Sequence, residues 1–306
     1  MIRRVAVLGA GALGAVYAKI FHQAGITTTL VAKGERFERI QRDGIYINDT
    51  RYRLPVLNAA DADDNFTADL VIVATKYHQL ASALPDLANV VGRNTLFVSL
   101  LNGLTSEDII GEMYGRENVL LSIAMNLDAR REENRIYHTR PPLLVFGEVN
   151  NLKTSSKVQA VQEILDEVGI SYQTPEDMNR TMWWKFMINV GMNQSSAVTG
   201  ATFGRYKSEQ ELRWLKETLM REVIAVAKAE GVDLRDEDAT SFYETLDIIA
   251  EDGKTSMLQD IEASRKTEVE MFAPVVIELG KKHGIPTPVN QTVFSVIRTL
   301  EEQFKH

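Results

Sequence analysis

The stretch VAVLGAGALGAVYAKIF, residues 5–21, decides how the chain begins to fold. Residues 5–8 form an apolar run that ends at Gly9, and Gly9, Gly11 and Gly14 give the pattern GxGxxG directly before a helical pattern. This order predicts a strand, a tight turn and a helix. In such a turn the second glycine lets the backbone approach a pyrophosphate, which meets the unpaired N–H groups at the helix start.

The same stretch also resembles a secretory signal, because Arg3 and Arg4 precede it and small residues surround Ala18. The residues that follow favour the nucleotide site. A helix over residues 15–24 is predicted to end at Gly25, and the β-branched residues 26–32 predict a second strand. A complete βαβ unit within about thirty residues indicates a Rossmann-type dinucleotide-binding fold.

Composition narrows the class of protein. At 306 residues the chain is long enough for two domains, and an apolar content of 44% is typical of globular proteins. The net charge of −8 argues against a protein that binds nucleic acids or anionic membranes in general. The chain has no cysteine, which excludes disulfides and thiolate metal sites. We therefore expect a cytoplasmic protein with no transmembrane segment and no metal site.

The end of the second predicted strand bears on the choice of nucleotide. NAD sites usually place Asp or Glu there for the ribose 2′-hydroxyl, whereas a cationic residue accommodates the 2′-phosphate of NADP. Here Lys33 and Arg36 flank Glu35, so NADP is favoured. A solvated helix start, or an inward-turned Glu35, is the alternative.

Strand and helix patterns divide the chain in two. Strands are predicted over residues 69–75, 95–101 and 119–125, with a hairpin or sheet extension over 135–139 and 143–149 around two prolines. Helices are predicted over residues 178–197, 208–230, 236–251, 257–283 and 289–304. We expect an α/β Rossmann-type NADP-binding domain over residues 1–176, followed by an all-α substrate and catalytic domain over residues 177–306.

Polar residues follow two of the predicted buried strands. Lys76 comes directly after one strand and Asn102 after the next. Ligands of open α/β sheets bind at the carboxyl ends of the strands. Each residue is a candidate for the site, although Asn102-Gly103 is also an ordinary turn dipeptide.

The helix predicted over residues 178–197 carries Lys185, Asn189 and Asn193, four residues apart, among apolar and aromatic neighbours. At this spacing the three side chains form one stripe on the helix. The apolar surroundings favour a ligand-facing stripe over a solvent-facing one. The lysine can donate a proton or hold a carboxylate, and the amides can hold polar groups of a substrate.

The segment TSMLQDIEASRKTEVE, residues 255–270, holds two further candidates. Ser256 and Gln259 have the spacing of a helix capping box, which alone explains Ser256. Glu268 lies twelve residues later on the same predicted helix, amid charged residues expected to be solvated. Periodicity alone does not single it out.

These residues together resemble the ketopantoate reductase (2-dehydropantoate 2-reductase) family over essentially the whole chain. The shared segments, in order, are GAGALG at 9–14, TK at 75–76, NG at 102–103, KxxxNxxxN at 185–193, SMLQDI at 256–261, RKTE at 265–268 and HGIPTP at 283–288. The resemblance implies an NADP-binding Rossmann domain, a helical second domain and an active site in the cleft between them, acting in pantothenate biosynthesis. A homodimer is one expectation for the assembly.

The resemblance also implies roles for single residues. Lys185 is the implied proton donor, and Glu268 is implied in catalysis and cofactor contact. The implied substrate-binding residues are Asn102, Asn189, Asn193 and Ser256. The implied cofactor-binding residues are Gly9, Ala10, Gly11, Ala12, Leu13, Gly14, Lys33, Lys76, Asn102 and Glu268.

Three departures from the family pattern affect substrate recognition. Gly253 stands where the family has an asparagine, Ala273-Pro274 replaces an Asn-Gly pair, and Phe203 aligns near a further substrate-contacting asparagine. Reduction of a 2-oxo acid with NADPH is therefore expected more firmly than ketopantoate as the substrate.

The alternatives are a reductase of a bulkier or less hydroxylated 2-oxo acid, an NADPH sensor without turnover, and a structural interaction module. The presence of Lys185 and Glu268 speaks against the sensor, which needs only the Rossmann domain. The interaction module leaves the paired motifs unexplained.

Overall fold

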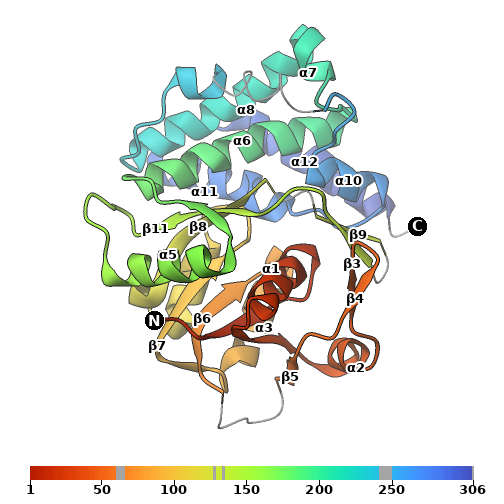
Figure 1. The fold of residues 1–306 in the computed structure, drawn as a ribbon. Coiled ribbons are helices and arrows are strands. Elements are labelled where there is room, and N and C mark those ends of the chain that lie inside the picture. Colours follow the sequence, from red (N-terminus) through yellow and green to blue (C-terminus); the bar gives the residue numbers. More distant parts are fainter. Residues whose placement is uncertain (60–65, 127–128, 133–134, 241–249, 305–306) are drawn as a thin grey trace. The chain divides into compact units, whose positions relative to one another are not determined.

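The computed structural model describes residues 1–59, 66–126, 129–132, 135–240 and 250–304. The chain divides into two compact units, Met1–Met178 and Asn179–His306 (Figure 1).

The first unit is built on an eight-stranded sheet with the order β12-β11-β8-β7-β6-β1-β2-β5 (Figure 1). The strands are β1 Arg4–Leu8, β2 Thr27–Ala32, β5 Val56–Asn58, β6 Ala68–Val73, β7 Val91–Ser99, β8 Val119–Met125, β11 Leu143–Gly147 and β12 Ser171–Gln173. From β5 to β8 all neighbours are parallel, whereas β11 is antiparallel to β8. In β1, Val5 and Val7 belong to one apolar cluster and Ala6 and Leu8 to another, so both faces of the sheet are buried.

Helices cover this sheet, and a second, four-stranded sheet with the order β4-β3-β10-β9 lies beside it. The helices are α1 Ala12–Gln23, α2 Gly34–Asp43, α3 Tyr77–Ala83, η1 Leu84–Leu87, α4 Ser106–Tyr114, η2 Arg116–Asn118 and α5 Ser156–Val168. The small sheet consists of β3 Ile45–Ile47, β4 Thr50–Tyr52, β9 Arg130–Glu132 and β10 Arg135–Tyr137.

The predicted βαβ unit is confirmed, with α1 beginning at Ala12 rather than residue 15. Gly25 has a φ of +82° and follows the helix end as predicted. Of the two alternatives predicted for residues 135–139 and 143–149, the hairpin is wrong and the sheet extension is confirmed for the second segment. β10 pairs with β3 and β9, whereas β11 extends the main sheet beside β8. Pro141 and Pro142 lack the N–H donors that a hairpin ladder requires between these strands.

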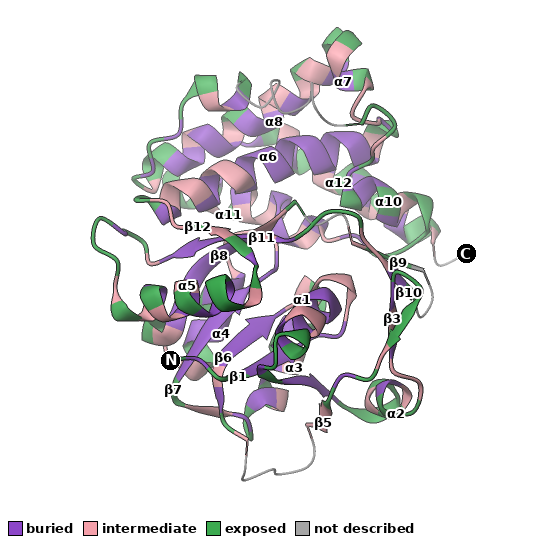
Figure 2. Cartoon of the chain, in the orientation of Figure 1, coloured by how far each residue is buried: buried purple, intermediate pink, exposed green. Residues whose placement is uncertain are grey.

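The second unit is helical, and its described residues contain no strand. Its helices are α6 Met178–Thr199, α7 Arg205–Ser208, α8 Gln210–Ala229, α10 Ser256–Glu262, η3 Val269–Met271, α11 Ala273–His283 and α12 Pro288–Gln303. Helices α8, α11 and α12 pack together, and Figure 2 shows α6 buried along most of its length. The predicted Rossmann-type α/β and all-α fold classes are thus confirmed. No described helix is long and apolar enough to cross a membrane.

Two helix predictions need comment. Of the helix predicted over residues 236–251, residues 236–240 are helical and residues 241–249 lie outside the described residues. The single helix predicted over residues 257–283 is wrong, because α10 ends at Glu262 and α11 starts at Ala273. Ser264 has a φ of +51°, which ends the first helix, and Pro274 fits only the first turn of the next.

Candidate active site

The glycine-rich turn after β1 has the shape of a phosphate cradle. Gly9 has a φ of +104°, and a Cβ there would lie 2.5 Å from the carbonyl oxygen of Ala74. A Cβ on Gly14 would lie 2.1 Å from the Gly9 oxygen, so both positions require glycine. At Gly11 the nearest atom to an added Cβ is 3.8 Å away, which leaves this side of the turn open for a ligand.

The start of α1 completes the cradle. Gly11 is the N-cap residue and provides no capping side chain. The N–H groups of the first turn, at Ala12, Leu13 and Gly14, have no acceptor within the helix and add its positive dipole end. Ala10 lies buried between the strand and this turn. These residues fit the pyrophosphate of a dinucleotide, as their sequence predicts.

The same sheet edge carries the two other polar candidates of this unit. The N–H of Ala74 donates to Leu8 O and the N–H of Leu100 to Val73 O, each at 2.8 Å, so the ends of β1, β6 and β7 lie side by side. Lys76 is the exposed N-cap residue of α3, and Asn102 is half-buried just beyond β7. The structure therefore brings Lys76, Asn102 and the glycine-rich turn to one edge.

Lys33 lies where the sequence places it, at the end of β2, but its charge is already paired. It is the N-cap residue of α2, and its Nζ lies 2.7 Å from Oδ1 of Asp86 in η1. A 2′-phosphate at this position has to compete with Asp86. The Lys33 side chain is exposed, whereas that of Asp86 is only 15% exposed.

A buried network under the Asn102 turn was missed by the sequence analysis. Ser99 Oγ accepts from the Leu101 N–H and bonds to Ser106 Oγ at 2.8 Å, and Ser106 Oγ donates to Glu107 Oε2 at 2.8 Å. The other carboxyl oxygen of Glu107 has no hydrogen-bond partner among the described residues. Burial raises the pKa of Glu107 to about 7. A Glu just after an Asn-Gly turn looks like a solvated helix start in the sequence, so no signal marked it as buried.

Glu107→Gln is expected to change how the stability of the protein depends on pH. The folded pKa of about 7 exceeds the unfolded value near 4.5, so wild-type stability falls as pH rises through this window, by about 3 kcal/mol in total. The glutamine side chain of the variant cannot ionise, so the variant does not lose this stability as the pH rises. Denaturant unfolding at about pH 5 and about pH 8 should show the variant gaining on the wild type. Glu112→Gln, an exposed change on α4, is the control; equal pH dependence in all three proteins would refute the expectation.

In the second unit, the polar residues of α6 fall into two groups. The first group is bonded to other helices: Gln194 Nε2 donates to Asn290 Oδ1 at 3.0 Å, and Ser195 Oγ bonds to the Tyr206 hydroxyl at 2.6 Å. The second group is the stripe formed by Lys185, Asn189 and Asn193. Lys185 and Asn193 form no hydrogen bond or ion pair with any described residue.

The stripe is not a solvated face. Asn189 and Asn193 are 6% and 7% exposed, and Lys185 is half-buried. Burial lowers the pKa of Lys185 from its ordinary value of 10.5. Its neighbour Phe186 packs against Trp183 and Phe272 with ring centroids 5.9 and 6.3 Å apart. An ammonium group in apolar surroundings, which forms no hydrogen bond or ion pair with any described residue, is suited to proton donation.

Ser256 does not cap its helix, contrary to the capping-box prediction. The N-cap of α10 is Thr255, whose Oγ1 accepts from the Leu258 N–H at 3.2 Å and bonds to Ser196 Oγ on α6 at 2.5 Å. The bond to Ser196 selects threonine over the adjacent serine. Ser256 is left exposed at the start of α10, beside the turn of α6 that follows Asn193.

Glu268 lies on a different element from the one predicted. It is the half-buried N-cap residue of η3, not part of the helix of Ser256. Four residues later Phe272 contacts Phe186, which adjoins Lys185 in α6. The segment that follows Glu268 therefore packs against α6.

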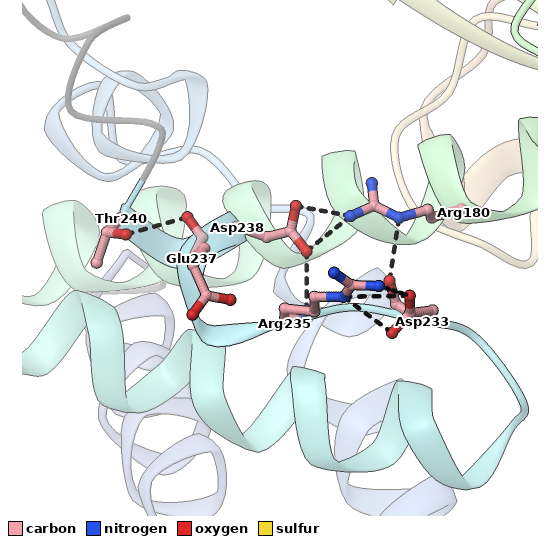
Figure 3. Close-up of polar contacts among 6 residues, drawn as sticks. All are labelled: Arg180, Asp233, Arg235, Glu237, Asp238 and Thr240. Atoms are coloured by element: carbon pink, nitrogen blue, oxygen red, sulfur yellow. Dashed lines mark hydrogen bonds and ion pairs between the residues drawn. The ribbon is translucent and has the colours of Figure 1, made fainter.

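A hollow in the second unit is lined by charged side chains that pair with one another. Figure 3 shows Arg180 donating to both carboxylate oxygens of Asp238 at 2.8 Å, while Arg235 pairs with Asp233 at 2.6 Å. The Arg180 Nε also donates to the Asp233 carbonyl at 3.0 Å. This network tethers residues 233–238 to the start of α6 and is structural.

Two family models match the chain. The model described as "Ketopantoate reductase PanE/ApbA" matches residues 5–151, and "Ketopantoate reductase PanE/ApbA C terminal" matches residues 177–301. A 2-dehydropantoate 2-reductase of Mesorhizobium japonicum is 29% identical, covering 97% of each chain, and one of Streptococcus pyogenes is 26% identical at the same coverage.

Solved structures share the fold. A D-mandelate dehydrogenase in complex with NADH and anilino(oxo)acetate has a TM-score of 0.90 at 22% identity, covering 99% of both chains. A dimeric ketopantoate reductase of Staphylococcus aureus has a TM-score of 0.83 at 21% identity, covering 98% of this chain and 99% of its own.

Proposed function

The chain belongs to the ketopantoate reductase family and is an NAD(P)-dependent oxidoreductase acting on a 2-oxo acid, and on that basis we propose that it reduces ketopantoate to pantoate with NADPH. The observation that carries the proposal is the stripe on α6. Gln194 and Ser195 on that helix are bonded to residues outside it, whereas Lys185 and Asn193 form no hydrogen bond or ion pair with any described residue and lie in apolar surroundings.

The chemistry follows from these side chains. A bound nicotinamide cofactor supplies the hydride that the ketone carbon accepts. Lys185 donates a proton to the developing alkoxide, and its charge stabilises that oxyanion. Asn189, Asn193 and Ser256 hold the carboxylate and hydroxyl groups of the substrate. Of the two roles expected for Glu268, orienting Lys185 or orienting the product hydroxyl, the second is the one proposed, because Lys185 forms no hydrogen bond or ion pair with any described residue.

The cofactor is held by the first unit in the same proposal. The N–H groups of the first turn of α1 bind the pyrophosphate, and Gly9, Gly11 and Gly14 let the backbone approach it. Lys76 and Asn102 lie at the nicotinamide end. Lys33 favours NADPH over NADH through the 2′-phosphate.

A cytoplasmic homodimer acting in pantothenate biosynthesis completes the proposal. The ketopantoate reductase of Staphylococcus aureus, which shares the fold, is dimeric, and this supports the proposed assembly. The absence of cysteine from all 306 residues fits a reducing compartment.

A second candidate function has its own support, in the contact between two residues that depart from the family pattern. The N–H of Phe203 donates to the Gly253 carbonyl at 2.9 Å. A Cβ on Gly253 would lie 2.8 Å from Cδ2 of the Phe203 ring. An aromatic ring and a glycine thus replace two amide side chains, which suits a 2-oxo acid with a bulkier apolar group.

The two candidates are separated by NADPH oxidation with a panel of 2-oxo acids. We expect kcat/KM to be highest for ketopantoate, compared with 2-oxoisovalerate and with benzoylformate as the aryl member. Preference for an apolar member would replace ketopantoate by the second candidate. Tight NADPH binding without turnover of any acid would instead indicate a sensor.

A further inference from the structure

Helix α12 carries a carboxylate on its buried face. The buried residues of this helix are Asn290, Val293, Ile297 and Glu301, at the three- and four-residue spacing of one helix face. Glu301 is only 6% exposed. A charged group at such a position costs desolvation energy that an apolar side chain would not. The hydrogen bonds that Glu301 accepts are therefore the reason for a carboxylate here.

Both oxygens of Glu301 accept hydrogen bonds. Oε1 accepts from the backbone N–H of Thr267 at 2.8 Å and from the Thr267 hydroxyl at 2.6 Å. Oε2 accepts from Nη1 of Arg298, one turn earlier on α12, at 2.8 Å. Thr267 is itself only 1% exposed. One buried side chain of α12 thus holds both donors of Thr267, through bonds to an ionised acceptor, which are stronger than neutral ones.

The same bonds hold the backbone on both sides of Glu268. The Thr267 hydroxyl, which donates to Glu301, accepts from the backbone N–H of Val269 at 3.3 Å. Glu301 therefore fixes the N–H group before Glu268 directly and the N–H group after it through Thr267. Residues 262–266 are exposed, whereas Thr267 and Val269 are buried and Glu268 between them is half-buried. The backbone at Glu268 is thus fixed at the point where the chain turns from the surface into the core.

We propose that Glu301 is a positioning residue for Glu268 and acts through the hydrogen bonds of Thr267. The inference rests on the proposed function, in which Glu268 orients the product hydroxyl. A side chain that binds a reacting group has to be held within about 0.5 Å of its working position. Without Glu301, the N–H and the hydroxyl of Thr267 lose their acceptor inside the protein, so residues 265–271 shift and Glu268 moves with them.

The first measurement is hydrogen exchange of the full chain, followed by mass spectrometry of the peptide that holds residues 265–271. Glu301→Ala removes the acceptor of the Thr267 N–H, so we expect exchange in this peptide to be faster by about tenfold or more. Glu301→Gln keeps an acceptor oxygen but loses the charge, and should fall between the alanine variant and the wild type. Glu278→Gln removes an exposed carboxylate from α11 and should leave the exchange unchanged.

The second measurement is kcat for NADPH oxidation, with the 2-oxo acid of the panel that the wild type reduces fastest. Glu301→Ala should lower kcat about tenfold to hundredfold, the cost of moving a working group by about 1 Å, and Glu301→Gln should lower it less. In a protein that already carries Glu268→Gln, the same alanine change should lower kcat no further, because the two residues act as a unit. A merely structural role would lower kcat by the same factor in both backgrounds.

The outcomes separate the inference from the proposed function. Unchanged exchange in Glu301→Ala, or an equal loss of kcat in both backgrounds, overturns the inference and leaves the proposed function intact. Glu268→Gln with wild-type kcat overturns the inference together with the role proposed for Glu268. Wild-type protein that reduces none of the acids overturns the inference and the proposed function. Should Glu301→Ala fail to fold, as judged by thermal unfolding, Thr267→Val repeats both measurements, because valine lacks the hydroxyl that links Val269 to Glu301.

Discussion

Lys185→Ala is expected to lower kcat by roughly 10² to 10⁴, the usual contribution of a general acid, while NADPH affinity stays near the wild-type value. The reason is that alanine cannot donate the proton that the alkoxide requires. The measurement is steady-state NADPH oxidation at saturating 2-oxo acid, together with direct NADPH binding. Lys281→Ala, an exposed lysine on α11, is the matched control and should behave as wild type.

Asn193→Ala distinguishes chemistry from binding on the same stripe. It should chiefly raise KM, because an amide that holds the substrate contributes equally to the ground and transition states.

Near-normal kcat in Lys185→Ala would contradict the assignment of Lys185 as the proton donor. Lys76 would then be the next donor to test.

The pH dependence of kcat in the wild type also tests the role of Lys185 as the proton donor. Burial lowers the pKa of Lys185, so its donating, charged form is lost at a lower pH than for an ordinary lysine. We expect kcat to fall on the alkaline side below pH 10.5, and this limb should disappear in Lys185→Ala.

Gly11→Ala is expected to weaken NADPH binding by on the order of 10²-fold without lowering the thermal unfolding midpoint. The added Cβ meets no protein atom closer than 3.8 Å, but it occupies the side from which a pyrophosphate approaches. Cofactor titration and a thermal melt of the same sample measure both effects.

Gly14→Ala is the informative comparison for that experiment. Its Cβ would lie 2.1 Å from the Gly9 carbonyl oxygen, so this change should destabilise the fold as well as the cradle. Unimpaired NADPH binding in Gly11→Ala would show that the pyrophosphate does not lie over the turn.

The parts of the fold that depend on local patterns could be predicted from the sequence. The β1–α1–β2 unit follows from an apolar run, three glycines and a β-branched run within a few residues of one another. The stripe on α6 follows from helical spacing alone, and the buried state of Asn189 and Asn193 agrees with the choice of a ligand-facing stripe.

The predictions for residues 255–283 are wrong where the sequence allows more than one local structure and tertiary contacts determine which one forms. Thr255 and Ser256 are equally good caps in the sequence, and only the bond to Ser196 on α6 selects Thr255. The single helix predicted over residues 257–283 is inconsistent with Pro274, because proline is disfavoured inside a helix and marks the first turn of a new one. The residues before Pro274 are polar and compatible with a helix, so their sequence does not predict the positive φ of Ser264.

Deuterium transfer tests the central claim most directly. The protein is given NADPH labelled with deuterium at the transferring position of the nicotinamide ring, together with ketopantoate, and the product acid is analysed by mass spectrometry. The account predicts pantoate carrying one deuterium at C2, formed by the wild type and at least about a hundredfold more slowly by Lys185→Ala. Unlabelled product, or labelled product formed equally fast by both proteins, would contradict it.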